Sequence, residues 1–382
     1  MKLSTDRILT THVGSLARSP EATELLLKKE RGEAYDHGAF DRTIRQAVID
    51  IVKRQVEAGI DIVSDGETSK IGYSTYIKDR LTGFSGENIA KPNLDVAPYP
   101  EFRRRMALMT GGQSFKRMFC TGPIAVKDHD AVKIDIANFK AATAEAKPVD
   151  AFLNAASPGV AASFQPNKYY PSHEAYVEAM AAALQEEYEA IAAAGFVLQI
   201  DCPDLAMSRH TGFQDLTEAE FLKRAAHQVE VLNHALRDIP AEAMRLHICW
   251  GNYEGPHDHD IGVRKILPLL LKAKPQAISF EASNPRHAHE WVEWRDAKLP
   301  EDKVLIPGVI DSCTNYVEHP ELVAQRIIQF ADIVGRERVL AGVDCGFGTF
   351  AGAGKIDPEI GFKKLGSLVE GAAIASRKLW RR

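Results

Sequence analysis

Apolar residues recur at helical spacing in two long segments, and each segment is followed by a glycine and a short apolar run. In residues 40–57 the apolar positions are Ile44, Val48, Ile51, Val52 and Val56. Gly59 then ends the helix, and residues 60–63 are typical of a short buried strand. The same order of helix, glycine and strand returns in residues 176–194, Gly195 and 196–200. The pattern therefore predicts repeated helix–strand units.

Further apolar runs predict strands at residues 8–13, 245–249, 277–281, 304–310 and 339–343. Several of these runs end in polar or reactive side chains, and parallel β-α barrels place their active sites at the C-terminal ends of the strands. We therefore predict an α/β fold of the TIM type, a (β/α)8 barrel. A doubly wound open sheet is the alternative. The barrel is favoured because the sequence has no G-x-G-x-x-G after the first strand and no G-x-x-x-x-G-K-[ST] motif.

Residues 71–119 and 121–147 follow no regular period, with Pro and Gly in the first part and charge in the second. We predict irregular insertions between the early strands, in the form of hairpin or loop excursions within residues 71–147. A chain of 382 residues is long enough for one barrel or for two average domains. We predict a single domain over residues 1–382.

Composition and charge narrow the classes of partner. The chain is 45% hydrophobic and 26% charged, as in ordinary soluble globular proteins, and its net charge of -5 includes no basic stripe for a phosphate backbone. The start lacks the apolar stretch of a signal peptide, and no later stretch is long enough to span a membrane. We expect a cytoplasmic protein with neither nucleic acid nor membrane as partner. Its five widely spaced cysteines favour metal binding or nucleophilic roles over a disulfide framework.

The sharpest local feature is the pair His247 and Cys249, because residues two apart in a strand point to the same face. Cys345 and Glu281 end two other apolar strands, and closure of a barrel would bring all three strand ends together. One imidazole, two thiolates and a carboxylate suit zinc. Taken alone, a histidine near a cysteine on a strand is more often a core residue beside an inert thiol. A buried unpaired carboxylate is harder to dismiss, because it needs a partner or a cation.

These residues resemble the catalytic C-terminal barrel of cobalamin-independent methionine synthase and its stand-alone relatives, which include epoxyalkane:coenzyme M transferases. The resemblance spans nearly the whole chain. In that family an H-x-C pair, a glutamate and a distant cysteine in a D-C-G context hold zinc. The resemblance therefore implies a Zn²⁺ cofactor with the ligands His247, Cys249, Glu281 and Cys345.

The resemblance also implies an amino-acid site. The family's I-G-S segment, which receives a substrate carboxylate, is similar to the segment that contains Gly14 and Ser15. The acids of its G-E and I-D-E-P motifs, which bind the amine of homocysteine, fall on Glu67 and Asp201 and would be the catalytic acids here. Cys202 replaces the glutamate of the second motif.

Two departures concern the alkyl donor. The segment similar to the family's T-G-P motif, residues 157–159, is followed by Phe164 and Gln165, without the tryptophan that stacks on a pterin. The family's catalytic histidine follows a G-V-x-D strand end, but residues 308–311 here lead to Ser312 and Cys313. Methyltetrahydrofolate is therefore not implied as the donor.

The resemblance implies zinc-dependent transfer of an alkyl group, typically methyl, to a thiol acceptor such as homocysteine. Thiol addition to an epoxide and cleavage of an alkyl ether or thioether are the alternatives within the same chemistry. A non-catalytic zinc-binding barrel and a metal-free barrel like uroporphyrinogen decarboxylase are alternatives of other classes. The expected partners are a small-molecule thiol and an alkyl donor. The sequence leaves the oligomeric state open, and a homo-oligomer is one state it allows.

Overall fold

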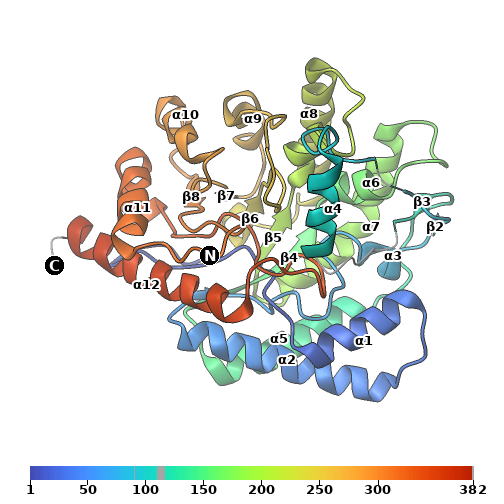
Figure 1. Ribbon diagram of the computed structural model, residues 1–382, viewed down its shortest axis with the longest axis horizontal. Coiled ribbons are helices and arrows are strands. Elements are labelled where there is room, and N and C mark those ends of the chain that lie inside the picture. The colour runs from blue at the N-terminus through green and yellow to red at the C-terminus, as the bar shows by residue number, and fades with distance from the viewer. Residues whose placement is uncertain (90, 110–116, 381–382) are drawn as a thin grey trace.

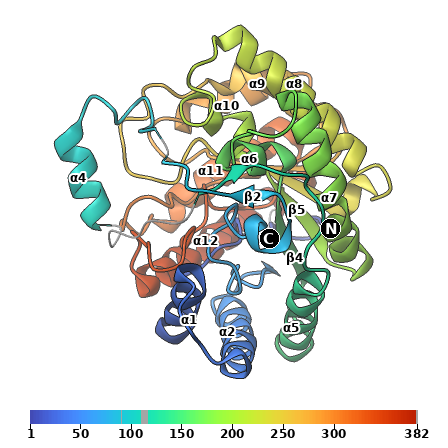
Figure 2. The ribbon, with the colours of Figure 1, turned by 90° about the vertical axis from the view of Figure 1, so that its right-hand side faces the viewer.

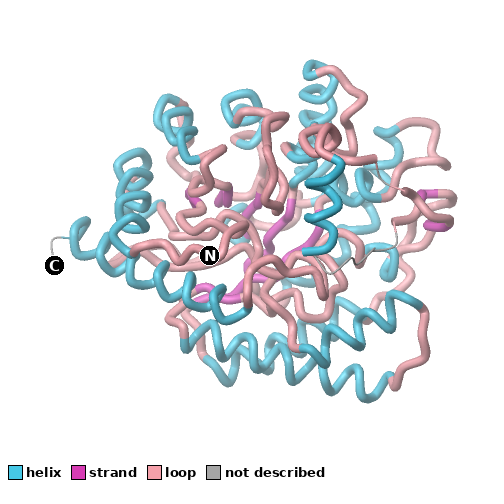
Figure 3. Tube along the Cα trace, viewed as in Figure 1, coloured by secondary structure: helices cyan, strands magenta, loops and turns pink. Residues whose placement is uncertain are grey.

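Six parallel strands form a curved sheet at the centre of the molecule (Figures 1 and 3). The computed structural model describes residues 1–89, 91–109 and 117–380. The strands follow one another across the sheet in the order β1-β4-β5-β6-β7-β8. Their bounds are Ile62–Val63 for β1, Asp150–Ala156 for β4, Val197–Asp201 for β5, Met244–His247 for β6, Ala277–Phe280 for β7 and Val304–Pro307 for β8.

Two segments that pair only through isolated bridges complete the ring of strands. Thr11 bridges Ile62 of β1, and its neighbour Thr10 bridges Ala341. On the other side, Leu305 of β8 bridges Val339, again in parallel. The sheet therefore returns upon itself through the N-terminal segment and the segment after α11 (Pro320–Val334). The predicted TIM-type fold is confirmed, and the open sheet is excluded.

The strands differ in detail from those predicted. β4 was not predicted, because its sequence Asp-Ala-Phe-Leu-Asn-Ala-Ala contains no β-branched residue and is rich in alanine, which is depleted in strands. β6 ends at His247, so Cys249 lies just beyond the strand rather than within it. The predicted strands at 8–13 and 339–343 are present only as isolated bridges.

Helices cover the outside of the ring (Figures 1 and 3). The two predicted long helices are α2 (His37–Glu57) and α7 (His173–Ala193), and each is followed by a glycine in the left-handed region, Gly59 with φ 88° and Gly195 with φ 87°. None of the helices in the described ranges is long and apolar enough to cross a membrane. The remaining helices of the ring are α5 (Ala131–Ala146), α6 (Pro158–Phe164), α8 (Glu218–Ala235), α9 (Val263–Leu270), α10 (Trp291–Asp296), α11 and α12 (Pro358–Trp380).

The chain between β1 and β4 contains short elements that do not belong to the ring. β2 (Phe84–Ser85) and β3 (Phe119–Cys120) pair in antiparallel, and α3 (Ile77–Arg80) precedes them. Helix α4 (Pro100–Met109) stands away from the barrel in Figure 2, and α1 (Pro20–Arg31) lies beside α2. Residues 90 and 110–116, within the range predicted to hold excursions, lie outside the described residues. That the whole chain forms one domain stays a prediction.

The ring is apolar at one end and polar at the other. Because side chains alternate along a strand, every second residue points inward. Inward residues near the strand beginnings form a small apolar cluster, which includes Phe152, Val197 and Val304. Further along the strands the inward positions carry polar side chains, and the candidate site is built there.

Candidate metal and substrate site

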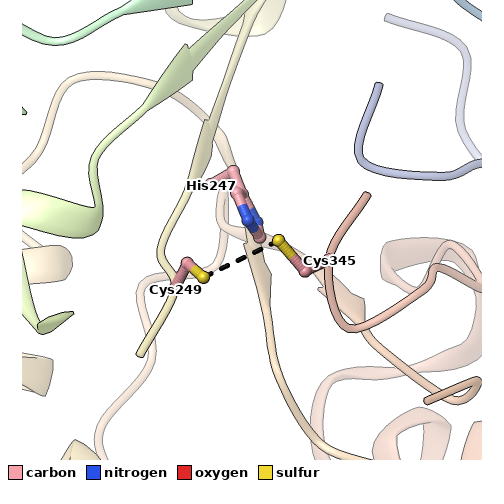
Figure 4. A group of neighbouring side chains, drawn as sticks. All are labelled: His247, Cys249 and Cys345. Atoms are coloured by element: carbon pink, nitrogen blue, oxygen red, sulfur yellow. Dashed lines mark hydrogen bonds between the residues drawn. The ribbon is translucent and has the colours of Figure 1, made fainter. Parts of the chain in front are cut away.

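Three side chains from two distant parts of the chain converge at the C-terminal end of the strands (Figure 4). His247 ends β6, Cys249 follows it, and Cys345 lies in the loop after the bridged segment at 339–342. Their ligand atoms all lie within 4.8 Å of one another, and the two sulfurs are 3.7 Å apart. Two sulfurs bound at about 2.3 Å to a tetrahedral ion lie about 3.8 Å apart. The spacing therefore fits a shared tetrahedral metal ion.

The chemistry of these groups also fits a metal. In the described part of the chain neither ring nitrogen of His247 forms a well-directed hydrogen bond, although the backbone of Ser279 lies near the ring, and nitrogens buried in this way are costly unless they bind something. Burial, with a smaller contribution from the nearby Arg245, lowers the pKa of His247 to about 3, so the imidazole is neutral. The hydrogen bond between Cys249 and Cys345, together with burial, raises the pKa of the Cys249 thiol. A divalent cation would reverse that shift and convert the thiols into thiolate ligands.

Glu281 lies close to this group but is not part of it. The residue follows β7 directly and is 6% exposed. Its carboxylate accepts hydrogen bonds from the backbone N–H of Trp250 at 2.7 Å and from Asn284 Nδ2 at 2.7 Å. Its charge contributes to the raised pKa of Cys249. Whether Glu281 becomes a metal ligand stays a prediction, because its oxygens are held by these two donors.

Asp344 ties the loop that carries Glu281 to the loop that carries Cys345. Its two carboxylate oxygens accept five hydrogen bonds from three consecutive residues, at 2.8–3.1 Å. The donors are the backbone N–H groups of Ala282, Ser283 and Asn284, the Ser283 hydroxyl and the Asn284 amide. Because Asp344 precedes Cys345 directly, these bonds fix the position of the thiol relative to the Glu281 carboxylate.

Gly308 lies close to Asp344, and this close approach gives a prediction on the stability of the fold. A Cβ at Gly308 would lie 2.2 Å from Asp344 Oδ1 and 2.6 Å from its backbone nitrogen. We expect Gly308→Ala to lower the free energy of unfolding by about 1–3 kcal/mol, because the backbone must move. The measurement is urea denaturation. Gly366→Ala is the control: it lies within α12 with no atom within 4 Å of its added Cβ, and should raise stability by about 0.5–1 kcal/mol. Equal effects of the two substitutions would contradict this account.

Glu67 and Asp201 lie near one another and are both buried, at 2% and 4% exposure. Burial, reinforced by the charge of Asp201, raises the pKa of Glu67 to about 8. Burial likewise raises the pKa of Asp201 to about 6, against hydrogen bonds that favour its charged form. Glu67 Oε2 has no hydrogen-bond partner among residues 1–89, 91–109 and 117–380, and Glu67 has a positive φ of 54°. A strained backbone and an unpaired buried carboxylate are both typical of a binding site.

Three polar residues of the barrel interior were missed by the sequence reasoning. Asn154, Gln199 and Arg245 occupy neighbouring register positions on β4, β5 and β6. Gln199 Nε2 donates to Asp201 Oδ1 at 2.7 Å, and Arg245 Nε donates to Gln199 Oε1 at 2.6 Å. Asn154 Nδ2 donates to Asp201 Oδ2 at 3.1 Å. The signal was present, because each of these polar residues alternates with apolar ones in a buried strand.

Gly14 and Ser15 lie against the same interior. Gly14 has a φ of 136°, and a Cβ there would lie 2.3 Å from Asn154 Oδ1, so a glycine is required. The carbonyl of Val13 accepts hydrogen bonds from Asn154 and Gln199, the residues that also bind Asp201. The segment at residues 13–15 is therefore connected to Asp201 through two amide side chains.

Cys313 lies in the loop that follows β8, at the position where the resemblance to the methionine synthase family places a histidine. Its thiol is 3.5 Å from Asn252 Oδ1, and Asn252 also donates to the carbonyl of Gly346, next to Cys345. Burial raises the pKa of the Cys313 thiol, so the group is protonated. The structure therefore places a neutral thiol near Glu281 and Cys345.

Comparison with known proteins gives three findings. A family model described as the catalytic domain of cobalamin-independent synthase matches residues 8–357. Methionine synthases of Saccharolobus islandicus (strain L.S.2.15 / Lassen #1) and Sulfolobus acidocaldarius are 24% and 22% identical over 378 and 374 residues. These matches cover 98% and 97% of this chain and 96% and 93% of the two relatives.

The third finding concerns a solved structure. The chain is similar to that of a B12-independent methionine synthase from Shewanella sp. W3-18-1 in complex with selenomethionine. The TM-score is 0.70 at 18% identity, covering 98% of this chain and 100% of that chain. At this level of identity the likeness shows a shared fold.

Proposed function

Because the chain belongs to the family of cobalamin-independent synthase catalytic domains, we propose that it is an enzyme that transfers an alkyl group, most simply methyl, to a thiol acceptor. The observation that carries the proposal is the convergence of one neutral imidazole and two thiols within 4.8 Å at the end of the barrel. Both curated relatives carry the name methionine synthase, which supports methyl transfer to homocysteine as the reaction.

We propose that His247, Cys249 and Cys345 hold a zinc ion, with Glu281 as the fourth ligand. One neutral and two anionic soft donors form a ligand set that zinc prefers. When bound, the ion would supply the positive charge that keeps an acceptor thiol in its nucleophilic thiolate form, whereas a free thiol with a pKa of about 8.5 is mostly protonated at neutral pH. Asp344 and Asn284 would position the two loops that carry Glu281 and Cys345.

We propose that the acceptor is an amino acid with a side-chain thiol. The unpaired Glu67 Oε2 and the Asp201 carboxylate are the groups that would receive its ammonium. The segment of Gly14 and Ser15, which is joined to Asp201 through Asn154 and Gln199, would receive its carboxylate. Glu67 and Asp201 thus orient the acceptor so that its sulfur faces the thiol ligands.

The identity of the alkyl donor is less constrained than the identity of the thiol acceptor. With Cys313 in place of the family's histidine, thiol addition to an epoxide and cleavage of an alkyl ether or thioether stay open as second reactions of the same site. A barrel that binds zinc without catalysis is the alternative of another class. The non-catalytic barrel differs from the proposed enzyme in whether its zinc can bind a substrate thiol. A purely structural zinc would be fully ligated and would not accept a thiol.

The experiment that tests the function combines metal analysis with X-ray absorption at the zinc edge. We expect about one zinc per chain, and one additional zinc–sulfur path when L-homocysteine is added. Methyl transfer to homocysteine is then measured with candidate donors, and methionine is the product detected. A protein that retains zinc but shows no change with any thiol would contradict the proposal and would favour the structural role.

A further inference from the structure

A cavity lies beside the candidate site and has no assigned role. Its volume is about 600 Å³, which is within the usual range for a small-molecule site. Its apolar wall includes Phe347, Phe350 and Ile360, and its polar wall includes Arg18 and Lys355. The cavity therefore combines an apolar surface with two cationic side chains.

The cavity shares a wall with the site proposed for the thiol acceptor. The backbone N–H of Phe347 donates to the carbonyl of Ser15 at 2.9 Å, and Phe347 is two residues from Cys345. Arg18 Nη2 donates to the carbonyl of Glu67 at 2.8 Å, and its Nη1 donates to the carbonyl of Gly348 at 2.6 Å. A ligand in the cavity would thus contact residues that are hydrogen-bonded to Ser15 and Glu67 of the acceptor site.

Two hydrogen-bond donors of the cavity wall lack an acceptor. Among the described residues Arg18 Nε has no acceptor, and because this atom is fully buried the guanidinium contributes its charge to the wall. In the described part of the chain, the partly buried Lys355 ammonium forms no hydrogen bond or ion pair, and it lies over the Tyr253 ring at 5.9 Å from the ring centre. Burial lowers the pKa of Lys355, which reflects the cost of the uncompensated charge. Buried donors without acceptors are costly, and a bound acceptor would remove the cost.

The acidic groups that the structure describes near the cavity do not accept hydrogen bonds from Arg18 or Lys355. Asp357 lines the cavity, but its Oδ1 accepts hydrogen bonds from the backbone N–H groups of Glu359 and Ile360 at the start of α12. Glu67 and Asp65 act on Arg18 through their charge, yet within the described residues the guanidinium donates only to the carbonyls of Glu67 and Gly348. The charge of Glu254 acts on Lys355, but no ion pair joins these two residues in the described part of the chain.

We propose that this cavity binds the oxyanion of a second substrate, a carboxylate or phosphate carried on a small apolar body. The oxyanion accepts from the Lys355 ammonium and is attracted by the charge of the Arg18 guanidinium, and the apolar body packs against Phe347 and Phe350. This inference rests on the proposed function in so far as the second substrate is the alkyl donor, which would approach the thiol across the shared wall. The donor is then an anionic molecule.

Binding of simple probes to the zinc-loaded protein tests the inference without requiring catalysis. Phenylacetate, the neutral phenylacetamide and inorganic phosphate are titrated by calorimetry. We expect phenylacetate, phosphate or both to bind at one site per chain, and the amide not to bind. Lys355→Met should weaken this binding about ten- to a hundredfold, as for the loss of a charged hydrogen bond. Lys355→Arg should retain it.

Lys363→Met is the matched control, because Lys363 is exposed on α12 and the substitution removes the same charge from the same region. Circular dichroism confirms that each variant is folded, and Lys355→Arg covers the case in which the Met variant is not. The inference is overturned if neither anion binds, or if the amide binds as tightly as phenylacetate. It is also overturned if Lys355→Met and Lys363→Met weaken binding equally.

Titration in the presence of saturating L-homocysteine separates this inference from the proposed function. A pocket for a second substrate must be filled together with the first, so the affinity for the anion should change less than about threefold, that is by less than 1 kcal/mol. Mutually exclusive binding would overturn the inference. Anion binding without any alkyl transfer would leave the cavity assigned and would instead contradict the proposed function.

Discussion

Cys345→Ser is expected to leave the barrel folded but to abolish stoichiometric zinc and to lower thiol methylation by about a thousandfold or more. The thiolate of Cys345 is one of the two sulfurs 3.7 Å apart that would hold the ion, and a serine hydroxyl is a poor zinc ligand at neutral pH. The loss of a charge contribution of several kcal/mol corresponds to at least three orders of magnitude in rate. Metal content by mass spectrometry and methionine formation are measured on the same preparation.

Cys120→Ser is the matched control for this prediction. Cys120 is also fully buried, but it lies in β3 and its thiol contacts the carbonyl of Gly122 at 3.5 Å, outside the metal group. The control variant should keep its zinc and its activity. A Cys345→Ser protein that is free of zinc and fully active would refute the metal-dependent mechanism.

Asp201→Asn is expected to raise the KM for homocysteine by about 30- to 4000-fold. The substitution preserves shape but removes the charge that would pair with the substrate ammonium, and loss of one partner of a buried charge pair costs about 2–5 kcal/mol. It also leaves the amide donors of Gln199 and Asn154 facing an uncharged amide. The measurement is the KM for homocysteine at constant donor concentration.

The control for this prediction is a substrate rather than a variant. 4-Sulfanylbutanoate has the thiol and the carboxylate of homocysteine but no amine, so its KM should be nearly the same in the wild type and in Asp201→Asn. If the substitution affects both thiols equally, Asp201 does not recognise the amine. A structural role would produce that equal effect, and the comparison therefore separates the two.

The comparison of homocysteine with 4-sulfanylbutanoate also tests the ionisation of Asp201 and Glu67. The pKa values of Asp201 and Glu67 are raised by burial to about 6 and about 8, so both are increasingly protonated as the pH falls through that window. The ionised forms bind an ammonium group. The ratio of affinities, homocysteine over 4-sulfanylbutanoate, should therefore rise with pH between about 6 and 8. A ratio that is independent of pH would contradict the role of these acids.

Much of the candidate site could be predicted from the sequence because its parts are local. The pair His247 and Cys249 is separated by one residue, and Asp201 directly ends an apolar run. Periodicity also predicted α2 and α7 with their glycine ends, and most of the parallel strands. β4 was missed, because an alanine-rich run without β-branched residues does not differ from a helical one until its neighbours in the sheet are known.

The sequence by itself determined the alternation of helix and strand, the TIM-type barrel and the residue types from which a thiol-rich site could be built. Only the tertiary structure decided how these residues meet: that the sulfurs of Cys249 and Cys345 lie 3.7 Å apart, that Glu281 is held by Trp250 and Asn284, and that Arg18 and Lys355 line one cavity. The physical reason is that contacts between residues far apart in the chain depend on strand register and loop packing. Both are set by the whole ring of strands rather than by any local pattern.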